Sequence, residues 1–147
     1  MLRRSLFAAA VTFFCTSGMA IADFVPDPSL DGQWCFWLYL VSEQGAAHAC
    51  HLPHAAIDDL VDSGLARIEA FIVSKSAHPP VTPAEIADLR ESQESQSAEI
   101  IKTHALDVPC KDLGPGGSFG QRLLPLSVLR QEIDDLTTHL TGRMSCN

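Results

Sequence analysis

Three histidines and a cysteine lie within seven residues of the chain: His48, Cys50, His51 and His54. Neutral imidazole is a common ligand of zinc and copper, so this spacing suggests a metal site. However, Pro53 disfavours helical backbone at the residue before it, and no downstream pair supplies the further ligands that zinc normally takes. We therefore expect exposed histidines in a loop that leads into a helix, and no cofactor. A zinc or copper site formed by the three histidines is the alternative.

A second candidate for chemistry is the glycine-rich segment Gly114–Gly120, in which Ser118 occupies the centre of a G-x-S-x-G pattern. Aspartates and His139 follow in the order Ser, Asp, His that some hydrolases use. That motif works only where a strand enters a strained turn on a sheet, whereas this chain is patterned for helices. A flexible glycine connection also does not hold a nucleophile in place. We therefore expect no enzymatic activity, with a hydrolase that uses Ser118 as the third hypothesis.

The aromatic residues are concentrated in one run of eight apolar residues, Trp34–Val41, which holds both tryptophans and the only tyrosine. Such a run fits a buried helix or a buried strand, and we prefer the helix because no partner strand is evident. Tryptophan and tyrosine are common both in cores and in recognition sites. We expect the run to fill the core. If part of it lines a groove instead, the candidate binding surface is Trp34, Trp37 and Tyr39.

The N-terminus has the pattern of a secretory signal peptide. Arg3 and Arg4 precede an apolar run that ends at Phe14, and small residues follow up to Ala22. The run is much shorter than the ~20 residues that a membrane-spanning helix requires. We expect cleavage after Ala22 and a single mature domain, residues 23–147, in the periplasm or outside the cell, with no membrane insertion. The arginine pair also fits a twin-arginine leader, although the short stretch before it favours the general export route.

The cysteine count agrees with an oxidising compartment. Once Cys15 is removed with the leader, four cysteines remain, which predicts two disulfides: Cys35, Cys50, Cys110 and Cys146. We favour Cys35–Cys50 and Cys110–Cys146, because each bond would span a short connection or fix a terminus. The crossed pairings remain open, since the sequence alone does not determine connectivity.

Apolar periodicity predicts an all-α, three- to four-helix domain. The expected helices cover residues 32–42, 53–76, 83–104 and 125–141. Thr82 and Glu85 have the spacing of a capping box at the start of the third helix. We expect the second and third helices to form a hairpin on which the last helix packs. The polar stretch Arg90–Ser97 is expected to be solvent-exposed or frayed.

The charge balance restricts the partners. The chain has 10 basic and 18 acidic residues, and loss of two leader arginines changes the net charge from −8 to 8 − 18 = −10. This balance disfavours nucleic acid and anionic membranes, which attract clustered basic residues. The resulting hypothesis is a monomeric, exported, non-enzymatic protein that binds another macromolecule, in the manner of an inhibitor, an immunity protein or an adaptor. We expect a protein partner, with a basic one favoured, and contact regions on the acidic faces and the Gly114–Gly120 loop.

Overall fold

The computed structural model describes residues 26–103, 110 and 125–139 of the 147-residue chain. A short 3-10 helix, η1 (Pro28–Leu30), precedes four α-helices: α2 (Asp31–Ala49), α3 (Ala56–Lys75), α4 (Pro83–Thr103) and α5 (Leu126–Thr138). No strand occurs among the described residues, so the prediction of an all-α fold is confirmed. The predicted leader, Ser118, the Gly114–Gly120 loop and Cys146 lie outside the described residues.

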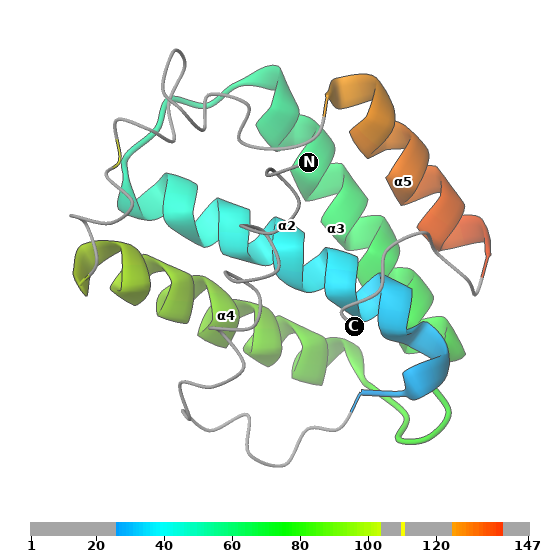
Figure 1. Cartoon of the computed structure of the whole chain (residues 1–147). Helices are drawn as coiled ribbons and strands as arrows, with labels where there is room; N and C mark the ends of the chain where they lie inside the picture. Colours follow the sequence, from blue (N-terminus) through cyan, green and yellow to red (C-terminus); the bar gives the residue numbers. More distant parts are fainter. Residues whose placement is uncertain (1–25, 104–109, 111–124, 140–147) are drawn as a thin grey trace, which may run out of the picture.

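Helix α2 is the common packing partner of the other long helices. Figure 1 shows α2 between α4 on one side and α3 on the other, with α5 beyond α3. The most extensive contact between helices is that of α2 with α4, followed by those that α3 makes with α5 and with α2. The expected hairpin is therefore only partly right. Helices α3 and α4 are joined by the proline-containing turn, but each packs more on α2 than on the other.

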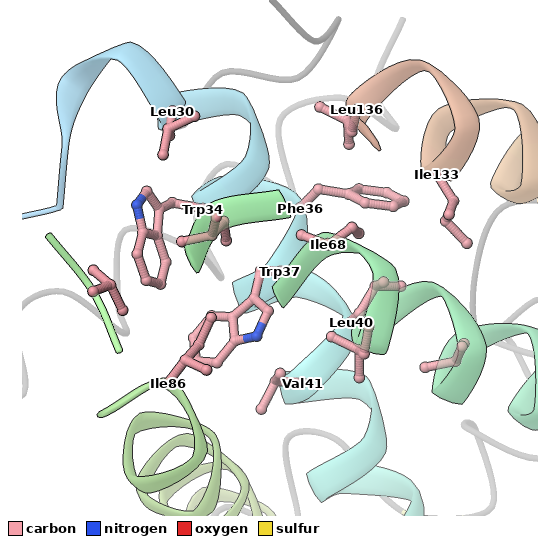
Figure 2. Packing of buried hydrophobic residues seen from close by; sticks show 14 of the residues in the cluster. Leu30, Trp34, Phe36, Trp37, Leu40, Val41, Ile68, Ile86, Ile133 and Leu136 are labelled. Atoms are coloured by element: carbon pink, nitrogen blue, oxygen red, sulfur yellow. The ribbon is translucent and has the colours of Figure 1, made fainter. Parts of the chain in front are cut away.

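The central position of α2 explains why its sequence is apolar on every side. Trp34 and Trp37 are only 5% and 2% exposed, and their rings meet edge to face with centroids 5.6 Å apart. In Figure 2 both side chains lie among the buried residues of the cluster. The aromatic run is thus a helix and not a strand. Trp34 and Trp37 are buried, so they do not form an open surface in the structure.

Tyr39 is the least enclosed of the three aromatic residues in the proposed surface. It is half-buried, and its ring lies 6.0 Å from that of Phe36, centroid to centroid. Burial, with the charge of Glu43 as a second cause, raises the pKa of the Tyr39 hydroxyl. Tyr39 packs against the edge of the core and does not form a surface with the two tryptophans.

Helix α5 joins the core through an apolar stripe, as predicted. Leu129, Ile133 and Leu136 are fully buried, and Gly64 of α3 leaves room for Ile133 because a Cβ atom there would overlap the Ile133 Cδ1. Gln33 of α2 contacts the C-terminal end of α5. Its fully buried Nε2 donates to the carbonyls of Leu136 at 3.1 Å and His139 at 2.9 Å. These bonds satisfy carbonyls that the end of a helix leaves without partners.

The disulfide pairing differs from the one we favoured. Cys50 bonds Cys110, with their Cα atoms 5.3 Å apart, so the expected bonds Cys35–Cys50 and Cys110–Cys146 are both wrong. Helix α2 continues to Ala49, which separates Cys35 and Cys50 by about 22 Å along one helix, at about 1.5 Å per residue. A disulfide cannot span that distance. Cys35 is also disulfide-bonded, and its partner lies outside the described residues.

Candidate functional site

The histidine-rich stretch forms the C-terminal cap of α2. His51 has a left-handed backbone, with φ of 51°, directly after the C-cap residue Cys50. The N–H of His51 donates to the His48 carbonyl at 3.1 Å, and the N–H of Leu52 donates to the Ala47 carbonyl at 3.0 Å. This pair of bonds is a Schellman motif, in which the left-handed position is usually glycine. The stretch therefore has a structural role that accounts for its sharp turn.

The three histidines do not form a joint site. His48 belongs to the last turn of α2 and His51 to the cap, whereas the Nε2 of His54 lies 2.8 Å from the Asp59 Oδ1. The hydrogen bond and the charge of Asp59 raise the pKa of His54. All three side chains are exposed. Among the described residues, no group of three or more His, Cys, Asp or Glu side chains is arranged to hold a metal ion.

The described surface has an open, polar groove where α2, α3 and α4 meet. It encloses about 490 Å³ and is lined by Gln44, His48, Asp62, Glu69, Ala87, Arg90, Glu91 and Glu94. Four of these residues are acidic, and one, an arginine, is permanently basic. We call this region the acidic groove. Helix α2 supplies Gln44 and His48, while the carboxylates come from α3 and α4.

Arg90 is the centre of the hydrogen-bonding network in the acidic groove. Its Nε donates to the Glu94 Oε1 at 3.0 Å within α4, and its Nη2 donates to the Gln44 Oε1 at 2.9 Å across to α2. Its Nη1 lies 3.6 Å from the Glu69 Oε1, and its Nη2 lies 4.0 Å from the Asp62 Oδ1, both on α3. One guanidinium group thus connects all three helices that form the groove.

Two carboxylates of the acidic groove, Glu69 and Asp62, are hydrogen-bonded to buried side chains of α2. Glu69 accepts a hydrogen bond of 3.0 Å from the indole Nε1 of buried Trp37, which satisfies a donor that would otherwise be costly to bury. The side-chain amide of Gln44, itself buried, donates to the Asp62 carboxylate. Glu69 and Asp62 are therefore oriented by groups on α2. Glu91 and Asp62 are the exposed carboxylates of the groove, whereas Glu69 and Glu94 are half-buried.

The groove depends on a close approach between α2 and α4 at Gly45. A Cβ atom at Gly45 would lie 2.7 Å from the backbone oxygen of Glu94 and 2.8 Å from the Ser97 Cβ. Beside this contact, the Gln93 Nε2 donates to the Ser42 Oγ at 3.2 Å, and both Gln93 and Ser97 are buried. The expectation that residues 90–97 are exposed or frayed is only partly right. Glu91 and Ser95 are exposed, but the stretch is helical, and Gln93 and Ser97 are buried because the missing side chain of Gly45 admits small and polar groups of α4 into the interface.

Sequence reasoning did not find the acidic groove, because its residues are separated in the chain and come from three helices. The only local signal was the spacing of Arg90 and Glu94, one helical turn apart, which is typical of an ion pair along a helix. Chemically, the arrangement is suited to attract a cationic group, since the single positive charge of Arg90 offsets only one of the four negative charges.

Comparisons of the chain with protein-family models, with curated proteins and with solved structures give no match. The fold and the site define the class of this protein in physical terms: an all-α domain with a Cys50–Cys110 disulfide and an acidic groove between three helices. Within the described part of the chain, every helix falls short of the length or apolar character that crossing a membrane requires.

Proposed function

We propose that the protein is an exported, non-enzymatic domain that binds a basic segment of another protein in the acidic groove. The observation that carries this proposal is the groove itself, with the carboxylates of Asp62, Glu69, Glu91 and Glu94 around one arginine. Arginine and lysine side chains of a partner would meet an excess of negative charge there, because one arginine faces four carboxylates. Glu91 and Asp62 are the carboxylates that an approaching group can reach first, because both are exposed.

Long-range electrostatics support the same kind of partner. The chain has a net charge of −8, and removal of the predicted leader makes it more negative. A field of one sign speeds the encounter with an oppositely charged protein and disfavours nucleic acid. Complementary charge across an interface gives specificity and association rate more than it gives affinity. The proposed complex is therefore expected to weaken as ionic strength rises.

Export is part of the proposal. The leader pattern with Arg3 and Arg4 predicts it, and the Cys50–Cys110 disulfide fits an oxidising compartment. The acidic groove is the feature of the described surface on which the proposal rests, and its lining is suited to binding a cationic group. We therefore propose action by binding, in the manner of an inhibitor, an immunity protein or an adaptor.

The test uses the mature chain, immobilised and exposed to periplasmic extract at low salt. Glu91→Lys reverses a charge in the acidic groove, whereas Glu99→Lys reverses an exposed charge of the same helix outside it. The two variants have the same net charge. We expect a partner that is retained by the wild type and by Glu99→Lys, and that loses at least tenfold in affinity with Glu91→Lys.

Two results would contradict the proposal. An equal loss with both variants would mean that the partner responds to total charge and not to the groove. The absence of any retained protein at low salt would mean that the acidic groove does not bind a soluble partner from that compartment.

A further inference from the structure

Helix α4 contacts the rest of the molecule differently from the other helices. It has 21 residues, but only four of them are buried, and two of those are polar: Ile86, Gln93, Ser97 and Ile101. The buried apolar residues lie near its ends. Helix α5, with only 13 residues, buries three apolar side chains completely. The hydrophobic contribution to docking is therefore small for α4 in relation to its length.

Polar contacts hold the middle of α4. Gln93 bonds Ser42, and Arg90 bonds Gln44 and approaches Glu69. When α4 separates from α2, water can replace each of these partners, so the net free energy that each contact contributes is small. The ion pair of Arg90 with Glu94 lies within α4, so it does not contribute to docking.

Electrostatic repulsion acts against docking at the same place. Glu91 and Glu94 of α4 face the groove together with Asp62 and Glu69 of α3, and Arg90 is the only arginine or lysine that lines it. Removal of the Arg90 charge would leave carboxylates of α4 opposite carboxylates of α3 with no counter-charge between them. Arg90 is thus the one side chain that offsets this repulsion in the middle of α4.

We propose that α4 is a separately opening element, which undocks from α2 while α2, α3 and α5 remain packed, and that Arg90 is its latch. The chain keeps α4 nearby when it is open, through the turn after α3 and through the Cys50–Cys110 disulfide beyond its C-terminus. Opening would uncover the face of α2 that carries Ser42 and Gly45. This inference concerns the free protein and does not rest on the proposed function.

Native-state hydrogen exchange measured by mass spectrometry tests the proposal, because it reports opening segment by segment. In the wild type we expect amides in the middle of α4 to exchange at least tenfold faster than those of α3 between Leu65 and Ile72. Arg90→Gln should speed exchange in α4 at least a further threefold and leave α3 unchanged. The matched control is Arg67→Gln, which removes an arginine paired with Asp134 at 2.7 Å between α3 and α5.

Equal exchange rates in α4, α3 and α5 of the wild type would overturn the proposal, since they would mean that the helices open only together. A uniform rise in all helices of Arg90→Gln would also overturn it. The wild-type comparison requires no substitution, so it decides the matter even if the Arg90 variant does not fold. A rise in α4 exchange with Arg67→Gln as large as with Arg90→Gln would refute the role of Arg90 as the latch.

Discussion

Substitution of Gly45 by alanine tests the close approach of α2 and α4 that shapes the acidic groove. The added Cβ would lie 2.7 Å from the Glu94 backbone oxygen and 2.8 Å from the Ser97 Cβ, closer than carbon normally approaches either atom. The first of these is a main-chain atom within a helix. Rotation of a side chain therefore cannot relieve the overlap, and α4 must move away from α2.

The expected magnitude follows from two opposing terms. Overpacking a close contact costs about 1–3 kcal/mol, and contact with backbone places this case in the upper part of that range. Alanine in place of glycine in a helix interior gains about 1 kcal/mol through helix propensity. We therefore expect Gly45→Ala to lower the free energy of unfolding by about 1–2 kcal/mol.

Gly64→Ala is the matched control. Gly64 also lies within a helix and is buried, so the gain in helix propensity is the same. Its added Cβ would overlap the Ile133 Cδ1, which is the end of a side chain that can adopt another rotamer. The overlap is therefore cheaper to relieve, and we expect the free energy of unfolding to stay within about 1 kcal/mol of the wild type.

Urea denaturation, followed by tryptophan fluorescence and by far-ultraviolet circular dichroism, measures both variants. A change in midpoint at constant slope reports stability, and a changed slope would report altered compactness or loss of two-state behaviour. The reasoning would be refuted if Gly45→Ala were as stable as Gly64→Ala or more stable. That result would mean that α2 and α4 are not in van der Waals contact at Gly45.

Three further predictions concern single residues. Gln33→Met should lower the free energy of unfolding by about 1–3 kcal/mol in the same urea assay, because it leaves the buried Leu136 carbonyl and the partly buried His139 carbonyl at the end of α5 without this donor. His51→Gly should raise the free energy of unfolding by about 0.5–1 kcal/mol, because glycine adopts the left-handed backbone without steric cost. A decrease would contradict the assigned cap. Hydrogen bonds from Ser29 and from the Ala77 backbone hold the pKa of Asp27 far below its ordinary value of 3.8. The stability that Asp27 provides is therefore complete above about pH 5 and is lost as pH falls below its unfolded-state pKa, so Asp27→Asn should flatten the acid limb of the stability profile.

The features that the sequence predicted well are local ones. The Thr82–Glu85 capping box is present, with the Thr82 N–H donating to the Glu85 Oε2 at 2.8 Å and the Glu85 N–H donating to the Thr82 Oγ1 at 3.2 Å. Its spacing and chemistry lie within four consecutive residues, so no tertiary information is needed. The amphipathic pattern likewise placed α3, α4 and α5 within a few residues of their bounds.

The disulfide pairing failed because it depends on helix length and on how helices are arranged. The expected end of the first helix at residue 42 would have allowed Cys50 to return toward Cys35. Helix α2 instead continues for another two turns, to Ala49. Helices α2 and α4 run parallel, because Ser42 contacts Gln93 and, further along both helices, Gly45 approaches Ser97. The C-terminal ends of both helices therefore lie at the same end of the molecule. Cys110, which follows α4, therefore meets Cys50.

The acidic groove was hidden from the sequence for a related reason. A polar stretch such as Arg90–Ser97 is normally solvent-exposed, because burial of polar groups without partners is costly. Here the partners come from α2, whose Gly45 admits the backbone of α4 and whose Ser42 and Gln44 receive its side chains. Neither helix encodes this contact alone. As a consequence of this polar contact, α4, which forms one wall of the acidic groove, is also the helix with the fewest buried apolar residues for its length.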